Sequence, residues 1–211
     1  MMATTHAFVG LALAAALALV APQFAVVVAV AAIVGGIFPD LDLYAGHRRT
    51  LHFPVYYWLL AAPASVVGLV VPTEATVAVA VFLLAAALHS SMDAFGGGLE
   101  LKPWRGTSNR AVYSHYHGRW LEPRRWVRYD GAPEDLALAI VLAVPGLLVF
   151  DGVVRTVVLA LLAVSAVYAL LRKPLAAIGE RLLERLPDRV LERLPKRFLP
   201  IEESDLERID D

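Results

Sequence analysis

Two carboxylates and two histidines lie close together in the stretch PDLDLYAGHRRTLHFP, at positions 40–52, directly after an almost uncharged run that ends at Phe38. A second pair, His89 and Asp93, is separated by four residues in HSSMD, so on a helix both side chains face the same way. Histidine nitrogens and carboxylate oxygens bind zinc, and they also bind manganese or iron. Because the chain contains no cysteine, any metal site must use these two ligand types.

These residues predict a site for one or two divalent ions, with zinc as the first choice. Asp40 or Asp42, together with His52, completes a four-ligand set with the HSSMD pair, and a histidine near the start of the chain is placed to bind a second ion bridged by Asp93. The carboxylate of the two that is not a ligand is predicted to act as a general base or to orient a metal-bound histidine. The predicted ligands are His6, Asp40, Asp42, His52, His89 and Asp93.

Each of these residues taken singly also has an ordinary structural explanation. A Pro-Asp pair at the end of a helix is commonly a turn or a cap, and a buried histidine can be satisfied by hydrogen bonds within a core. The prediction depends on the conjunction: a His/Asp pair at helical spacing, a loop with a carboxylate before a histidine, and His6 at another helix end.

The elements that must position these side chains are apolar. Of 211 residues, 58% are hydrophobic and 18% are charged, which argues against an ordinary soluble domain. The composition without period-2 alternation favours helices over a membrane β-barrel, and a span takes about 20 residues, so two of the six apolar stretches are short. We predict an all-α, polytopic membrane helical bundle with about six apolar helices at 4–20, 24–38, 54–72, 75–92, 136–150 and 153–171.

The distribution of positive charge predicts the orientation of the bundle. Of 19 Lys and Arg residues, only Arg155 lies between the fifth and sixth stretches, and all others lie in the even-numbered connections or after the last stretch. The positive-inside rule makes that side cytoplasmic. We therefore expect a multi-pass protein of the inner (cytoplasmic) membrane with both termini in the cytoplasm, and every histidine falls on the cytoplasmic side.

Two segments outside the apolar stretches suggest contact with lipid. The loop 94–134 interleaves Arg with Trp and Tyr, a mixture suited to the headgroup region, although a solvated loop packed on the bundle explains it equally well. The motif E-R-L-P occurs twice in 184–195 and predicts a C-terminal amphipathic helix, followed by an acidic tail. We divide the chain into a membrane-embedded domain, 1–172, and the helix and tail, 173–211. Membrane lipids are the expected partners, no nucleic-acid binding is expected, and a protein partner stays open.

The sequence resembles the YdjM-like family of LexA-binding, inner-membrane-associated metal-dependent hydrolases over about the first half of the chain. The matching elements are Thr5–His6, PDLD at 39–42, HRRTLH at 47–52, and HSSMDAFGGG through KPW at 89–104. Here Arg49 replaces the glycine that usually follows His-Arg in that family. The family is in turn distantly similar to zinc-dependent phospholipase C, and this implies an early histidine, a loop aspartate, a histidine and the HSSMD pair as ligands.

The predicted chemistry is metal-assisted hydrolysis of a phosphoester or lipid-linked substrate. A bound divalent ion activates a water molecule, so no side-chain nucleophile is needed. Asp42 and Arg48 are the predicted catalytic residues, and arginine suits bidentate binding of phosphate. The predicted substrate-binding residues are His47, Arg48, Arg49, Arg105 (or Arg110) and His115. The alternative is a non-enzymatic membrane scaffold or regulatory protein with a structural metal. A transporter is less favoured, because its ionisable residues would lie near the middle of the bilayer.

Overall fold

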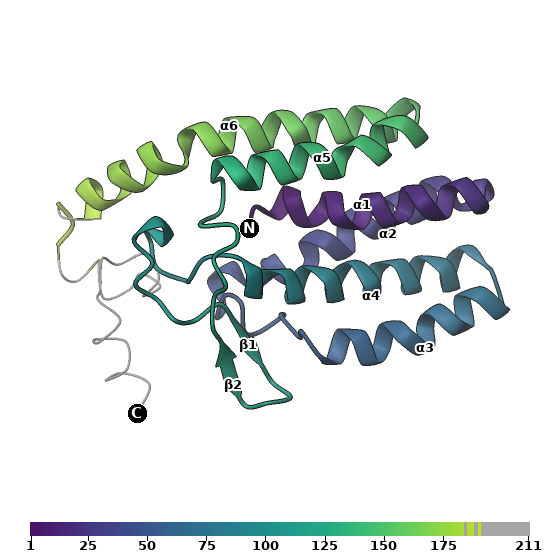
Figure 1. Cartoon of the computed structure of the whole chain (residues 1–211), viewed down its shortest axis with the longest axis horizontal. Coiled ribbons are helices and arrows are strands. Elements are labelled where there is room, and N and C mark those ends of the chain that lie inside the picture. The colour runs from purple at the N-terminus through teal and green to yellow at the C-terminus, as the bar shows by residue number, and fades with distance from the viewer. Residues whose placement is uncertain (184, 188–189, 191–211) are drawn as a thin grey trace.

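The chain forms a bundle of antiparallel helices, seen in a computed structural model that describes residues 1–183, 185–187 and 190. Successive helices run in opposite directions, and the loops and the N-terminus gather at one end of the bundle (Figure 1). The α-helices of the described residues are α1 (Ala3–Val20), α2 (Ala25–Ile37), α3 (Tyr56–Val70), α4 (Glu74–Met92), α5 (Pro133–Val149) and α6 (Gly152–Leu183). Their bounds follow the six predicted apolar stretches, apart from the C-terminal end of α6, which lies beyond residue 171.

Four segments of the described chain are long and apolar enough to cross a membrane: 3–20, 22–43, 74–95 and 152–183. The prediction of about six such helices is confirmed only in part, because α3 has 15 residues and α5 has 17. The two helices α3 and α5 are short for different reasons. The apolar run of α3 is shortened by irregular segments at both ends, and α5 begins with Pro133, Glu134 and Asp135. These long apolar helices are compatible with a membrane protein.

Short elements connect the helices, and most of them lie at the end of the bundle with the loops (Figure 1). Four 3-10 helices connect the longer ones within the described chain: η1 (Pro22–Phe24), η2 (Phe38–Tyr44), η3 (Asp93–Phe95) and η4 (Pro103–Arg105). The loop 94–134 contains a two-stranded antiparallel hairpin, β1 (Val112–Ser114) and β2 (Arg119–Leu121), with Tyr113 opposite Trp120. The all-α prediction therefore missed one hairpin, because strands of three residues leave too short a pattern to recognise in a sequence.

Small residues allow α1, α2 and α4 to approach closely, as is common between helices in membranes. A Cβ added to Gly35 would lie 2.3 Å from the carbonyl oxygen of Phe82 on α4, and one added to Gly36 would lie 2.8 Å from that of His6 on α1. Both contacts are with backbone, which cannot move aside. The two glycines therefore let α2 lie against both neighbours at the level where the histidines sit.

A buried carboxylate joins the start of α1 to the start of α5. Asp135 accepts hydrogen bonds from the backbone N–H of Met2 at 2.8 Å, from the Thr5 hydroxyl at 2.7 Å and from the N–H of Gly131 at 3.0 Å. Three donors satisfy the carboxylate, which offsets the cost of burying it. This contact fixes the first turn of α1, the turn that carries His6.

The last helix does not end where the sequence suggested. The sequence predicted an apolar helix that ends at residue 171, but α6 continues through Pro174 to Leu183. Most of the two E-R-L-P motifs, and the acidic tail, lie outside the described residues.

Candidate metal centre

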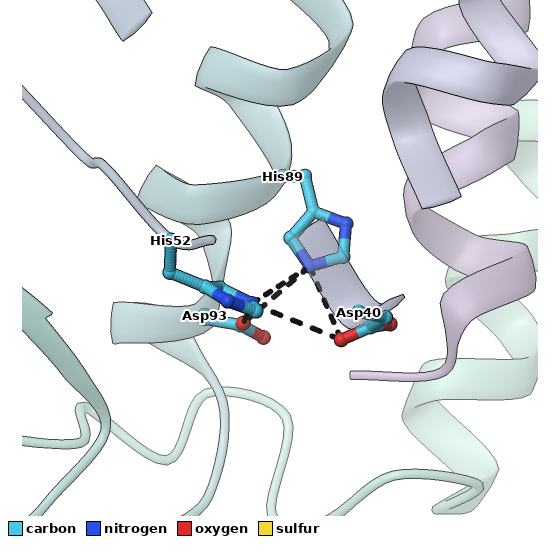
Figure 2. A group of neighbouring side chains, drawn as sticks. All are labelled: Asp40, His52, His89 and Asp93. Carbon is cyan, nitrogen blue, oxygen red and sulfur yellow. Dashed lines mark hydrogen bonds and ion pairs between the residues drawn. The ribbon is translucent and has the colours of Figure 1, made fainter. Parts of the chain in front are cut away.

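Four predicted ligands meet at the end of the bundle with the loops. Asp40 comes from η2, His52 from the segment before α3, His89 from the last turn of α4, and Asp93 from η3 (Figure 2). One ligand atom from each lies within 4.8 Å of the other three. The group could therefore hold a metal ion, and among the described residues it is the one group of three or more such side chains close enough to do so.

Five of the six distances between the four ligand atoms are close to those of a tetrahedral site, and the sixth, between the carboxylate oxygens of Asp40 and Asp93, is at most 4.8 Å. The Nε2 atoms of His52 and His89 are 3.2 Å apart, and they lie 3.1 and 3.6 Å from Oδ2 of Asp93. Oδ1 of Asp40 lies 3.7 Å from the first nitrogen and 3.4 Å from the second. A tetrahedron whose centre is about 2.0–2.2 Å from each corner, the usual zinc–ligand distance, has edges of roughly 3.3–3.6 Å. The side chains thus need little movement to hold an ion.

Hydrogen bonds behind the two histidines set which nitrogen faces the centre. Nδ1 of His52 lies 3.0 Å from the carboxylate of Asp42, and Nδ1 of His89 lies 2.6 Å from the carbonyl oxygen of Gly36. A carboxylate and a carbonyl can only accept, so each Nδ1 carries the proton and each Nε2 presents a lone pair. Metal-binding histidines commonly have such partners, which fix the ring and raise its basicity.

The centre is consequently a cluster of acceptors without a donor. Two Nε2 lone pairs and the oxygens of Asp40 and Asp93 face one another, and Oδ2 of Asp93 is buried without a hydrogen-bond partner. His52, His89 and Asp93 are each at most 1% exposed. Mutually facing buried acceptors repel unless a cation or a proton lies between them.

In the metal-free protein a proton on His52 relieves this repulsion. Burial alone would lower the pKa of His52, but its contacts with Asp42 and Asp93 outweigh burial and raise the pKa to about 9. A metal ion would replace this proton at the same position.

Asp42, which we predicted as a ligand or a catalytic group, lies behind His52 rather than in the four-atom group. Its two oxygens accept from the ring nitrogens of His47 and His52, both at 3.0 Å, and from the backbone N–H groups of Arg48 at 3.3 Å and Leu51 at 3.1 Å. This matches the orienting role left open by the sequence. Of the two aspartates in PDLD, Asp40 is the one that reaches the centre.

His6 lies on the far side of Asp93, outside the four-atom group. Its ring stacks on that of His89 with centroids 3.8 Å apart, and its Nε2 is 3.3 Å from Oδ1 of Asp93. The guanidinium of Arg48 and the Met1 amine are each 3.4 Å from the same oxygen. These positive groups disfavour the predicted second ion at this oxygen, because a further cation there would face two like charges.

Arg48 connects the metal ligands to the long loop. Its guanidinium donates to the carbonyl oxygens of Gly97 at 2.8 Å and Ala111 at 3.3 Å in addition to contacting Asp93. Its backbone has φ 59°, a left-handed conformation that costs about 1–2 kcal/mol for a non-glycine residue. The contacts around Arg48 hold this strained conformation.

A cavity of ≈ 320 Å³ borders the centre. Asp40, His47 and Arg48 line the side nearest the metal ligands, and Tyr168 and Arg172 of α6 line the opposite side. Of the four residues in the group, Asp40 alone lines the cavity, and its side chain is 22% exposed. The centre is therefore closed on the side of the bundle core and accessible at Asp40.

The predicted substrate-binding residues divide into two sets. His47 and Arg48 line this cavity, whereas Arg49, Arg105 and His115 are not among its lining residues. The guanidinium of Arg49 lies over the ring of Tyr113, at 4.8 Å, and His115 lies in the hairpin turn with Nε2 2.6 Å from the carbonyl oxygen of Arg49. His117 lies in the same hairpin turn as His115.

The sequence did not identify three parts of this site: the Gly36 carbonyl, Arg172 and Tyr168. The Gly36 carbonyl leaves no signal in the residue type. Arg172 counted only as a basic residue after the last span, yet its Nε donates to Asp130 at 2.8 Å, and the Tyr168 hydroxyl donates to the same carboxylate. Burial alone would raise the pKa of Asp130, but Arg172 and Tyr168 hold it below its ordinary value. The only indication of this contact in the sequence was the spacing of Tyr168 and Arg172, which are one helical turn apart and so lie on the same face of the helix.

Comparison with known proteins finds no match: no family model, no curated protein and no solved structure matches the chain.

Proposed function

We propose that the chain is a membrane-bound, metal-dependent hydrolase that acts on a phosphoester or lipid-linked substrate at the cytoplasmic face. The observation that carries the proposal is the group of four facing acceptor atoms, three of them on buried residues, all within 4.8 Å of one another and beside a cavity that reaches the group at Asp40. When bound there, a divalent ion would lower the pKa of a coordinated water from about 15.7 to about 7 and so supply a nucleophile at neutral pH. The resemblance to the YdjM-like family supports the same chemistry, and the His/Asp ligand set favours zinc, with manganese or iron as alternatives.

The residues of the chain divide the work between holding the ion and binding the substrate. His52, His89 and Asp93 would hold the ion from the buried side, and Asp42 keeps the Nε2 of His52 directed at the same point. Asp40 would complete the set at the cavity, where its carboxylate is the one exposed ligand. Arg48, together with His47, presents positive or donor groups along the cavity wall, which suits an anionic phosphoester.

The proposed setting is the inner membrane, with the metal centre at the cytoplasmic side. Support comes from the positively charged loops, which lie at the same end of the bundle as the centre (Figure 1). At about 1.5 Å per residue, α3 and α5 are about 23 and 26 Å long, a few ångströms short of a typical hydrocarbon core. We propose that both cross, because each is antiparallel to a longer neighbour and local thinning of the bilayer accommodates a short helix.

One observation favours the second candidate, a scaffold or regulatory protein with a structural metal. Four protein ligands already complete a tetrahedron, and structural zinc sites are closed in this way, whereas catalytic sites keep a position for water or substrate. The two candidates therefore differ in whether Asp40 leaves the ion during function.

Two measurements on the full chain purified in detergent test the proposal. Bound zinc, manganese and iron are measured in the wild type, His89→Ala and Asp93→Ala; both variants should lose most of the metal, and Arg49→Ala, outside the group and the cavity, should keep it. Hydrolysis of bis(p-nitrophenyl) phosphate and of phospholipids is then followed with and without a chelator. Chelator-sensitive turnover supports the hydrolase. Bound metal without turnover on any of them would favour the structural site, and retention of metal by His89→Ala would contradict the centre itself.

A further inference from the structure

A second hollow, of ≈ 420 Å³, extends along the C-terminal part of α6. We call it the α6 groove, and Leu101 of the long loop faces α6 across it. Apart from Arg172 at one end, every residue that lines the groove is a leucine, an alanine or a glycine: Leu101, Leu175, Ala176, Gly179, Leu182 and Leu183. Leu175 and Leu182 are 53% and 57% exposed, so their apolar surface has no cover among the described residues.

The α6 groove continues from the cavity beside the metal centre. Arg172 lines both, and it is fixed there by Asp130 and by a hydrogen bond of 3.2 Å from its guanidinium to the carbonyl oxygen of Leu101. The loop connects them in the same way, since Leu99 and Pro103 line the cavity and Leu101 lines the groove. A single elongated ligand could therefore reach from one to the other past Arg172.

The two hollows differ in chemistry as the two parts of a lipid do. The cavity has charged groups on its walls, including Asp40 and Arg48, while the groove is lined almost wholly by aliphatic carbon. Basic residues surround the junction: Lys102 pairs with Glu180, and the ammonium of Lys173 lies 5.6 Å from the ring centre of Trp104. Lysine and tryptophan together are typical of the headgroup level of a membrane.

We infer that the α6 groove binds one hydrocarbon chain of a membrane phospholipid whose phosphate headgroup occupies the cavity. The occupant is a lipid because the groove lies on a helix apolar enough to span a membrane, and because it opens from a polar cavity at the same end of the bundle. The substrate is then a phospholipid rather than a soluble phosphoester. This last step rests on the proposed function, whereas binding of the chain in the groove does not.

Gly179 gives a direct way to fill the groove. An added Cβ would have no atom within 4 Å, so Gly179→Phe places a ring in open space without disturbing a packed contact. Gly179→Ala leaves the groove almost unchanged and controls for the loss of glycine. Leu170→Phe controls for adding an aromatic ring to α6, because Leu170 is 76% exposed and lines neither hollow.

The experiment uses the full chain in detergent and phosphatidic acid with a photoreactive diazirine in the middle of one chain. After illumination, peptides are mapped by mass spectrometry. Crosslinks to 175–183 and to the peptide with Leu101 are expected in the wild type, Gly179→Ala and Leu170→Phe, with a loss of at least fivefold in Gly179→Phe. Equal labelling in Gly179→Phe, or no labelling of these peptides in the wild type, would overturn the inference.

Enzyme assays separate this inference from the proposed function. If the protein hydrolyses phosphoesters, Gly179→Phe should slow turnover of long-chain phosphatidic acid at least tenfold, mainly through KM, and leave bis(p-nitrophenyl) phosphate unchanged. If no substrate is hydrolysed but the crosslinks are lost in Gly179→Phe, the groove binds lipid and the hydrolase proposal fails alone. If turnover of phosphatidic acid and of bis(p-nitrophenyl) phosphate is slowed alike in Gly179→Phe, the groove has no role in selecting the substrate and the inference fails.

Discussion

Asp42→Asn is the substitution that best tests how the metal centre is built. Asn has almost the same shape as Asp, but its amide group would direct N–H donors at a site where Asp42 accepts from the ring nitrogens of His47 and His52 and from two backbone N–H groups. At least one donor must then face another donor. The ring of His52 loses its charged partner, and Nε2 is no longer held toward the centre.

The expected cost can be worked out in two ways. Loss of a partner behind a metal-bound histidine typically weakens metal binding 10–100-fold, which is about 1.4–2.7 kcal/mol. A hydrogen bond to a charged group contributes about 1.5–3 kcal/mol, a matching range. We therefore expect the affinity for zinc to fall 10–100-fold, less than in His52→Ala, which removes the ligand itself.

The assay is a competitive zinc titration of the detergent-purified protein with a chromophoric chelator. Asp130→Asn is the matched control, since Asp130 is a partly buried aspartate bonded to Arg172 and not to any residue of the four-atom group, and its affinity should stay within threefold of the wild type. An affinity within threefold for Asp42→Asn as well would show that Asp42 does not orient His52, and the reasoning would be refuted.

Two further predictions concern the protonation of the centre and the packing of the bundle. Because the pKa of His52 is raised to about 9, protonated His52 contributes its full stabilisation to the metal-free protein below pH 6.5, and this contribution is lost as the pH rises through 9. Zinc must displace this proton, so the affinity for zinc should rise about tenfold per pH unit from pH 7 to 9. An affinity that does not change with pH in zinc titrations would contradict this prediction. Gly35→Ala should lower the thermal unfolding temperature in detergent, because the added Cβ would lie 2.3 Å from the carbonyl oxygen of Phe82. Gly179→Ala adds a Cβ in open space and should leave that temperature unchanged or raise it, since alanine is the better helix former by up to about 1 kcal/mol. Equal effects of the two substitutions would argue against close packing of α2 on α4.

The amino-acid sequence by itself determined the helices and the identity of the chemical groups. Long apolar runs separated by short segments of proline, glycine and charged residues favour antiparallel helices. The six predicted stretches match α1–α6 within a few residues, apart from the extension of α6. The spacing of His89 and Asp93 was also sufficient, because helix geometry alone puts residues four apart on one face. The hairpin was missed because its strands are short and depend on contacts with the rest of the loop, such as the bond from Tyr113 N–H to the Arg48 carbonyl.

Only the tertiary structure decided which carboxylate reaches the centre and which supports it. Asp40 and Asp42 are two residues apart and chemically the same, and their roles differ because η2 turns one toward His89 and the other toward the backbone of residues 48–51. The Gly36 carbonyl, the placement of His6 behind Asp93, and the cavity wall of α6 likewise depend on how the helices pack. Such relations arise from distances between segments far apart in the chain, and these distances are set by side-chain and backbone packing rather than by any local pattern of residues.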